Sequence, residues 1–275
     1  MMRRFDLRAR KRLGQHFLVD ETVLERILSA AEITPADTIL EIGPGLGILT
    51  REMAARAGRV IAVELDNRLA GILKQALAPL TNVTIINDDI LHLDPAALPA
   101  GPTAYKVVAN LPYYITSPVL RHLLEASVRP ETMILMVQKE VAERIAAAPG
   151  RRSLLSISVQ FYGNPRIIDT VPAEAFHPAP EVDSAILRID VYRQPAVAVS
   201  DRQGFFDLVR GGFSASRKQI INSLAQGLAL DKPAVATLLD GAAIRPERRA
   251  ETLTLEEWAA LWRVFSVTKE GKTSC

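Results

Sequence analysis

The hydrophobic and polar positions of the chain predict a sheet of short buried strands connected by amphipathic helices. Aliphatic and β-branched runs recur through the first half of the chain, and such runs are typical of parallel strands that are buried on both faces. A later stretch in which apolar and polar residues alternate, together with two further apolar runs, predicts that the last strands of the sheet are antiparallel. The predicted strands are residues 38–42, 59–66, 83–86, 105–109, 133–137, 156–162, 166–171 and 185–191.

Capping residues and helical spacing predict the other elements. Asp20 is the predicted N-cap of a helix over 21–31, and Ser117 followed by Pro118 predicts another helix start. Beyond a linker at 194–200 the pattern is wholly helical, which separates a larger α/β domain (20–193) from a helical domain (200–275). A helix that follows the first strand is predicted to end at about Ala57. Further helices are predicted over 139–147, 203–211, 215–226 (ended by Gly227) and 233–239. A last helix starts at Thr254, with Glu257 as its capping-box partner.

The composition is that of a globular protein, and its charge is distributed unevenly along the chain. Its 275 residues are 48% hydrophobic and carry a net charge of +2. Residues 1–19 hold six basic and one acidic residue, residues 20–199 hold 16 and 21, and residues 200–275 hold 11 and nine. An acidic body with a basic arm (1–19) and a basic tail indicates phosphate contact, although a solubilising terminus is an equal alternative.

Several classes of site and location are excluded or disfavoured by the same inventory. The single cysteine, Cys275, excludes an internal disulfide, and the four histidines are scattered without ligand spacing, so we expect no metal. No apolar run reaches membrane length and no cleavable signal is visible, which predicts a cytoplasmic protein without a membrane partner.

The segment Asn110-Leu-Pro-Tyr113 stands where a strand ends, because Pro112 cannot donate to a ladder. Ligands of α/β proteins bind at the carboxyl ends of the strands. An amide side chain, a turn with accessible carbonyls and an aromatic face suit a flat base that bears an exocyclic amine. The alternative is a strand ending in a proline turn with a half-buried tyrosine.

A glycine-rich turn follows the first strand of the sheet and begins with Glu41, Gly43 and Gly45. The pattern is not G-x-G-x-x-G, and a carboxylate there repels a diphosphate, which disfavours a nicotinamide dehydrogenase. It can attract the ammonium of an amino-acid-bearing cofactor, so the turn indicates S-adenosylmethionine. An ordinary tight strand-to-helix turn is the alternative.

The next strand ends carry further polar groups. Glu64, with Asp66 as the alternate or as a helix N-cap, stands about twenty residues after the glycines, where a carboxylate meets ribose hydroxyls. Asn87-Asp88-Asp89 follow the next strand, and an acid there can accept from an adenine amino group. In the proline-rich loop 172–184, Phe176 is either a stacking face at the mouth of the site or a buried staple.

With these residues in place, the chain closely resembles the ribosomal RNA adenine N6,N6-dimethyltransferase family over nearly its whole length. The resemblance implies a class I methyltransferase fold, a seven-stranded α/β sheet with a small all-α C-terminal domain. The matching motifs are 13–18 (LGQHFL), 41–45 (EIGPG), 63–66 (VELD), 88–90 (DDI), 110–113 (NLPY), 176–184 (FHPAPEVDS), 213–224 and 249–251 (RAE).

The resemblance also implies a cofactor and a substrate. S-adenosylmethionine contacts are implied for His16, Leu18, Gly43, Glu64, Asp89 and Asn110. The implied substrate is a pair of adjacent adenosines in the hairpin loop near the 3′ end of 16S rRNA, within an immature small ribosomal subunit, and we expect a monomeric enzyme. Two departures stand out: Ser216 and Ile221 replace residues that are often basic in relatives, and many relatives have Asn where His16 stands.

These residues suggest a mechanism of positioning. Asn110 Oδ1 and the Pro112 carbonyl accept the two hydrogens of the adenine amine, while Tyr113 stacks on the base and Phe176 covers its other face. Rival functions are the large-subunit adenine methylation of macrolide resistance and a non-catalytic assembly or transcription factor on the same fold. The cations expected to contact RNA phosphates, rather than form ordinary solvated surface, are Arg10, Lys11, Arg12, Arg151, Arg152, Arg217, Lys218, Arg248 and Arg249.

Overall fold

The chain divides into two compact units. In the computed structural model, residues 16–98 and 104–273 are described, with side chains as far as residue 268. The first unit takes the residues up to Glu143 together with Asn164–Arg193, and the second takes Arg144–Gly163 and the chain from Gln194. The chain passes from the first unit to the second after Arg193, next to the linker predicted at 194–200. The segment 144–163, which lies within the larger α/β domain of the sequence prediction, groups with the helical unit.

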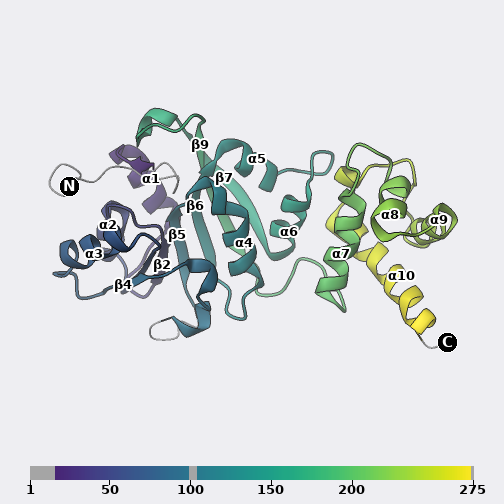
Figure 1. The fold of residues 1–275 in the computed structure, drawn as a ribbon, viewed down its shortest axis with the longest axis horizontal. Coiled ribbons are helices and arrows are strands. Elements are labelled where there is room, and N and C mark those ends of the chain that lie inside the picture. Colours follow the sequence, from purple (N-terminus) through teal and green to yellow (C-terminus); the bar gives the residue numbers. More distant parts are fainter. Residues whose placement is uncertain (1–15, 99–103, 274–275) are drawn as a thin grey trace. The chain divides into compact units, whose positions relative to one another are not determined.

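The first unit is built on a seven-stranded sheet of order β4-β3-β2-β5-β6-β9-β7 (Figure 1). The strands from β2 to β6 are parallel, and β9 runs antiparallel to β6, with Leu187 opposite Leu135. The predicted mixed α/β class is confirmed. The strands are β2 (Thr38–Ile42), β3 (Arg59–Glu64), β4 (Val83–Asn87), β5 (Lys106–Asn110), β6 (Thr132–Gln138), β7 (Gly163–Val171) and β9 (Ser184–Val191).

The central strands of this sheet are buried on both faces, as their apolar sequences predicted, whereas the edge strand β7 is largely exposed. Along β2, Ile39 belongs to the core cluster that includes helices α1 and α2, while its neighbour Leu40 points to the opposite face and is equally buried. Asp20 accepts from the N–H groups of Thr22 and Val23, which confirms the predicted N-cap of α1. The helices are α1 (Glu21–Ala31), α2 (Ile48–Ala54), α3 (Asn67–Ala76), α4 (Thr116–Glu125) and α5 (Lys139–Ile145).

The strand order reverses between β2 and β5. From β2 the chain moves to β3 and β4 on one side, and it then returns to β5 and β6 on the other. The helices that connect parallel strands diverge at such a reversal and leave a crevice at the carboxyl ends of the two central strands. The ligand site is therefore expected beyond Ile42 and Asn110, the last residues of β2 and β5.

A short two-stranded sheet crosses this edge. Strand β1 (Phe17–Leu18) pairs antiparallel with β8 (Phe176–His177), and the Val19 N–H donates to the Ala175 carbonyl at 2.9 Å. We call residues 16–19 the strap, because these bonds hold the beginning of the described chain against the loop that precedes β9.

Two predicted elements differ in the structure. Helix α4 begins at Thr116 with Ile115 at its N-cap, so Ser117 lies inside the first turn and caps nothing. Residues 154–162 form a helix, α6 (Leu154–Tyr162), and not the predicted strand. Ser153 and Ser156 form a reciprocal capping box at its start, and this local signal prevails over the alternating pattern.

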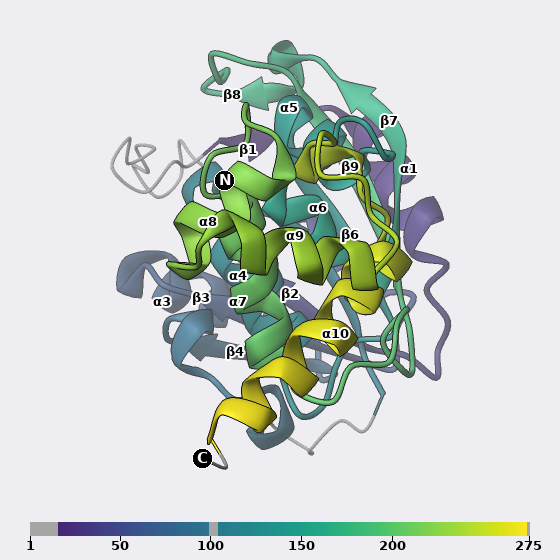
Figure 2. The same ribbon diagram turned by 90° about the vertical axis from the view of Figure 1, so that its right-hand side faces the viewer.

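The second unit is helical throughout its C-terminal part (Figure 2). Its core contains an aromatic cluster in which Phe161 of α6 lies 5.3 Å from Phe205 and 5.1 Å from Phe206 between ring centroids. Thr254 and Glu257 form the predicted capping box before α10. The helices that follow α6 are α7 (Arg202–Phe213), α8 (Ile220–Leu228), α9 (Lys232–Gly241) and α10 (Leu255–Thr273), and none of the described helices is long and apolar enough to span a membrane.

The sequence predicts that Gly227 ends its helix, but the structure shows that it does not. It lies within α8, which ends at Leu228 with Ala229 in the left-handed region (φ 53°) as its C-cap. A Cβ at residue 227 would stand 2.3 Å from the Gly211 carbonyl oxygen and 2.5 Å from its Cα. Gly227 is therefore required by the close backbone contact of α8 with α7.

Gly227→Ala should destabilise the helical unit by about 1–3 kcal/mol, because neither backbone can yield to the added methyl group. Urea unfolding followed by tryptophan fluorescence measures this, since Trp258 and Trp262, the two tryptophans of the chain, both lie in the helical unit.

The matched control is Gly71→Ala in α3, where no atom lies within 4 Å of the added Cβ. Alanine has a higher helix propensity than glycine, so this substitution should raise the free energy of unfolding by up to about 1 kcal/mol. Urea unfolding followed by far-UV circular dichroism measures the change. Equal effects of the two substitutions would contradict the packing argument.

Candidate active site

A cavity of about 400 Å³ lies at the reversal point of the sheet. Its volume is in the range of cofactor sites. The glycine turn after β2 and the turn after β5 both line it, so the two motifs that the sequence singled out share one space. The predicted cofactor and catalytic residues that line it are His16, Leu18, Glu41, Gly43, Gly45, Glu64, Asp89, Asn110, Pro112 and Tyr113.

The glycine turn brings backbone to the cavity wall. Gly43, Gly45 and Gly47 all have positive φ values, between 56° and 72°. A Cβ on Gly45 would stand 3.1 Å from the ring of Phe17, so the strap packs directly on the turn. These conformations favour glycine, and they leave the turn open to a ligand on its other side.

The structure distinguishes the two acids at the end of β3. Glu64 is 6% exposed and accepts from the Gly45 N–H at 3.3 Å and from the Asp66 N–H at 2.8 Å. Burial raises the pKa of Glu64 despite these bonds. Asp66 instead caps α3 by accepting from the N–H groups of Arg68 and Leu69. Glu64 is thus the acid of the cavity, and Asp66 is the N-cap that the alternative reading proposed.

Glu41 is the most deeply buried acid of the site, with 1% exposure. Burial raises its pKa to about 8, with a further contribution from the charge of Glu64, while the nearby Thr50 hydroxyl acts in the opposite direction. Its Oε2 has no hydrogen-bond partner among the described residues. A buried acceptor without a partner is costly, and it marks the place where a donor from a ligand fits.

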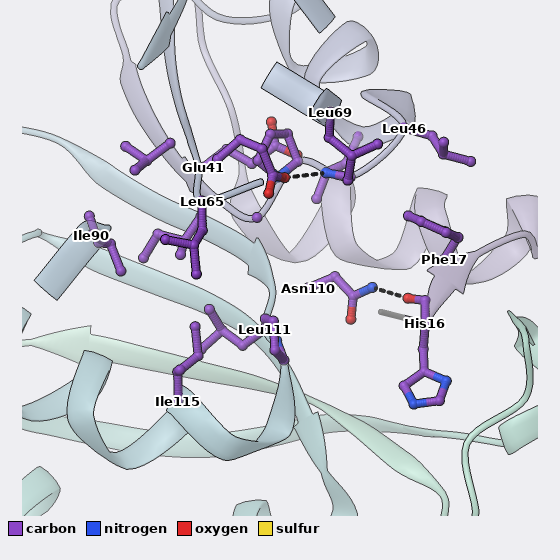
Figure 3. Close-up of a pocket in the computed structure, with 18 of the residues that line it drawn as sticks. His16, Phe17, Glu41, Leu46, Leu65, Leu69, Ile90, Asn110, Leu111 and Ile115 are labelled. Atoms are coloured by element: carbon purple, nitrogen blue, oxygen red, sulfur yellow. Dashed lines mark hydrogen bonds between the residues drawn. The ribbon is translucent and has the colours of Figure 1, made fainter. Parts of the chain in front are cut away.

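The apolar part of the cavity was not predicted from the sequence. Leu65 and Ile90 follow Glu64 and Asp89 directly, and with Leu111 and Ile115 they form one side of the cavity (Figure 3). Asp89 itself accepts from the Leu91 N–H at 2.9 Å. The sequence did contain a signal for this wall, because an apolar residue directly follows each of the two acids at the strand ends. Apolar side chains next to acids form a slot that suits a flat ring with polar groups at its rim.

The amide of Asn110 has a fixed orientation. Its Nδ2 donates to the main-chain carbonyl of His16 at 3.0 Å (Figure 3). A carbonyl can only accept, so the amide must turn its NH2 group toward the strap. Asn110 Oδ1 is consequently left as an acceptor at the cavity.

Tyr113 presents a half-buried ring to the same space. Its hydroxyl shares a 2.7 Å hydrogen bond with Ser184 Oγ, and burial raises the pKa of the phenol. The His16 ring lies nearly parallel to it, with centroids 6.0 Å apart. His16 Nδ1 is 2.8 Å from the Pro178 carbonyl, which holds the imidazole in place. Tyr113 is therefore held at both its edge and its face.

Phe176 is not at the mouth of the cavity. It is 4% exposed, pairs through β8 with Leu18 of the strap, and packs within the core cluster. A ring in this position cannot stack on an incoming base, so the structure favours the alternative of a buried staple.

The predicted RNA-contacting cations fall into three groups. Arg10, Lys11 and Arg12 lie outside the described residues. Arg151, Arg217 and Lys218 are exposed, and the last two precede α8 instead of opening it. The others have partners within the protein: Arg152 donates to the Leu253 carbonyl at 3.3 Å, Arg248 donates to the Thr252 carbonyl at 2.7 Å and pairs with Glu257, and Arg249 lies 3.7 Å from Glu251.

The partners of Arg248 indicate a structural role. Its guanidinium joins the loop before α10 to the capping box, and the pairing lowers the pKa of Glu257. Burial likewise lowers the pKa of Arg152. We therefore keep Arg151, Arg217 and Lys218 as the described candidates for phosphate contact.

Comparison with known proteins gives consistent results. The family model described as ribosomal RNA adenine dimethylase matches residues 6–261. Ribosomal RNA small subunit methyltransferase A of Dehalococcoides mccartyi (strain CBDB1) is 51% identical over 261 residues, or 95% of this chain and 90% of the relative. The protein of the same name from Moorella thermoacetica is 46% identical over 276 residues, or 96% and 95%.

Solved structures agree with the sequence relatives. The 23S rRNA methyltransferase ErmE superposes with a TM-score of 0.72 at 30% identity, over 91% of this chain and 99% of that one. A dimethyladenosine transferase from Plasmodium falciparum gives a TM-score of 0.77 at 25% identity, over 93% and 98%. With its class I methyltransferase fold and the cavity between the two motifs, the chain belongs to the ribosomal RNA adenine dimethylase family and is an rRNA adenine dimethyltransferase.

Proposed function

We propose that the enzyme transfers methyl groups from S-adenosylmethionine to N6 of two adjacent adenosines in the 3′-terminal hairpin loop of 16S rRNA. The substrate is an immature small ribosomal subunit in the cytoplasm, and the enzyme acts as a monomer. Relatives that are 41–51% identical carry the name of a small-subunit enzyme, which favours 16S over 23S rRNA. The observation that carries the proposal is the orientation of the Asn110 amide, which offers an acceptor to an amine in the cavity.

The residues of the cavity fit S-adenosylmethionine. The unpartnered Oε2 of Glu41 suits the ammonium of the methionine part, and Glu64 suits the ribose hydroxyls. Leu65 and Ile90 provide apolar contacts for the adenine ring, and Asp89, which lines the same cavity, can accept a hydrogen bond from its amino group. When bound, the cofactor supplies an electrophilic methyl group on a sulfonium centre.

The chain contributes mainly by positioning the nucleophile. The adenine N6 lone pair is delocalised into the ring and is a poor nucleophile. Asn110 Oδ1 accepts one N6 hydrogen and turns the lone pair out of the ring plane toward the methyl group. A new N–C bond forms as the C–S bond breaks, and the surplus proton leaves N6 for solvent. Alignment of this kind can supply up to roughly 7–11 kcal/mol in ideal cases.

The second acceptor comes from the main chain of the same turn. The Pro112 carbonyl already accepts the Ile115 N–H at 3.1 Å, which leaves it one lone pair for the second N6 hydrogen. After the first transfer the monomethylated amine has a single hydrogen left. One acceptor then suffices, so Asn110 can orient the amine in both transfers while the Pro112 carbonyl serves the first.

Tyr113 supports the base through its ring face. Because Ser184 fixes its hydroxyl, the ring is already in place before the base arrives. Base–aromatic stacking contributes about 1–3 kcal/mol, which helps to hold an adenine outside its RNA stack. With Phe176 buried, the near-parallel imidazole of His16 is a second ring beside Tyr113 in the lining of the cavity.

The proposal predicts where methyl groups appear. Incubation of the enzyme with labelled S-adenosylmethionine and immature small subunits should place label on two adjacent adenosines of the 3′-terminal hairpin, as mapped by nuclease digestion and mass spectrometry. Large subunits treated in parallel should remain unlabelled. Label on 23S rRNA alone would overturn the choice of substrate.

Asn110→Ala should lower kcat for methyl transfer by about 100-fold or more, because the orienting acceptor is lost. Calorimetry should show a much smaller change in S-adenosylmethionine affinity, since the groups that fit the cofactor's amino-acid and ribose parts remain. Near-normal turnover by this variant would refute the catalytic role of the amide.

Glu41→Gln should stabilise the cofactor-free protein most at high pH. The folded-state pKa of Glu41 is about 8, above the value of 4.5 for an exposed glutamate, so the protonated acid is favoured by folding. Its contribution to stability is complete below pH 4.5 and is lost as the pH rises toward 8. The melting temperature of the variant should therefore exceed that of the wild type increasingly from pH 5 to pH 8.

The same variant should bind S-adenosylmethionine more weakly, because glutamine cannot match an ammonium with negative charge. Melting scans with and without the cofactor separate these two effects. A variant that is less stable than the wild type by the same amount at every pH would show that Glu41 acts only through packing.

A further inference from the structure

The mouth of the cavity exposes large apolar side chains to solvent. Tyr114 is 56% exposed, Leu65 is 49% exposed and Ile48 is 42% exposed, and all three line the cavity. Nine large apolar residues are at least 38% exposed in the described part of the chain, and three of them gather at this one opening. Such clustering marks a surface that a ligand covers.

The proposed cofactor accounts for two of these residues but not for the third. Leu65 directly follows Glu64, and Ile48 directly follows the glycine turn, so both adjoin the groups that fit S-adenosylmethionine. Tyr114 belongs to the turn after Asn110, which faces the base that is methylated. Among the described residues, no hydrogen bond or ring contact involves Tyr114, so its exposed ring has no structural task within the fold.

The backbone of this turn directs two neighbouring rings to different places. Tyr113, Tyr114 and Ile115 form a 3-10 turn, which is closed by the bond from the Ile115 N–H to the Pro112 carbonyl. With three residues per turn, successive side chains point about 120° apart. Tyr113 points inward to the buried Ser184, and Tyr114 consequently points outward at the mouth.

We propose that Tyr114 forms a second base-stacking subsite, which binds the nucleobase adjacent to the adenine held in the cavity. The inference rests on the proposed function, in which the two target adenosines are neighbours. When one adenine enters the cavity, its neighbour loses a stacking partner within the RNA. An exposed aromatic ring on a rigid turn can replace that partner.

The test combines a protein variant with an RNA variant. Small subunits are reconstituted with 16S rRNA that carries either both adenosines or an abasic residue in place of one of them, introduced by ligation of a synthetic fragment. Methyl transfer to the remaining adenosine is measured for wild type, Tyr114→Ala and Tyr114→Phe. Tyr192→Ala is the matched control, because Tyr192 is also exposed (39%) and does not line the cavity.

With intact RNA, Tyr114→Ala should raise KM by about 5- to 150-fold, the range expected for one lost stacking contact. Tyr114→Phe and Tyr192→Ala should behave as the wild type. With the abasic RNA, wild type and Tyr114→Ala should show the same KM, because the stacking partner is already missing. Calorimetry should give the same S-adenosylmethionine affinity for all four proteins.

Three outcomes would overturn the inference. An equal KM increase on intact and abasic RNA would show that Tyr114 acts elsewhere, and an unchanged KM on intact RNA would show that it does not contact the substrate. A weakened affinity for S-adenosylmethionine would assign the ring to the cofactor. Failure of the wild type to methylate intact small subunits would instead refute the proposed function, so the two failures are distinguishable.

Discussion

The hydrogen bond from Asn110 Nδ2 to the His16 carbonyl is the constraint that organises the site. It joins the end of β5 to the strap, two segments that are far apart in the sequence. The strap is in turn held by its pairing with β8 and by the contact of Phe17 with Gly45. The orientation of one amide thus depends on the glycine turn, on the loop before β9 and on the first described residues. A site assembled in this way is preorganised, because the acceptor is aimed before any base enters.

The electrostatics of the cavity suit a cationic ligand with an apolar body. Glu41 and Glu64 are both buried and near enough for the charge of one to raise the pKa of the other. Backbone N–H groups satisfy Glu64, but Oε2 of Glu41 has no partner among the described residues. A diphosphate would meet repulsion here, whereas an ammonium relieves the cost of the buried acid. The carboxyl proposed to bind the ammonium would therefore also destabilise the cofactor-free protein at high pH, which links stability to the proposed function at a single residue.

The sequence predicts those parts of the site that depend on local rules. Proline and acidic residues at strand ends, and the geometry of parallel strands, placed Asn110, Glu64 and the glycine turn at one edge. Other features depend on a distant partner. Gly227 is explained by the backbone of Gly211, and the burial of Phe176 is explained by its pairing with the strap. Arg248 is predicted from the sequence to contact RNA phosphates, but the Thr252 carbonyl and the Glu257 carboxylate accept its hydrogen bonds within the protein. Residues 154–162 alternate like a strand, yet a capping box makes them helical.

The arrangement of polar groups argues for catalysis by alignment and not by a general base. The Tyr113 phenol has a raised pKa and shares its hydrogen bond with Ser184, so it does not ionise near neutral pH. His16 Nδ1 donates to the Pro178 carbonyl, and Asp89 accepts a backbone N–H. In the proposed mechanism the groups aimed at the amine are Asn110 Oδ1 and the Pro112 carbonyl oxygen, which accept hydrogen bonds but do not take the proton. The product of methyl transfer is cationic at N6 and is acidic enough to release its surplus proton to water, so an acceptor that fixes direction is what this reaction requires. That requirement also explains how one site can serve two successive transfers, since Asn110 needs only one hydrogen on the amine to orient it.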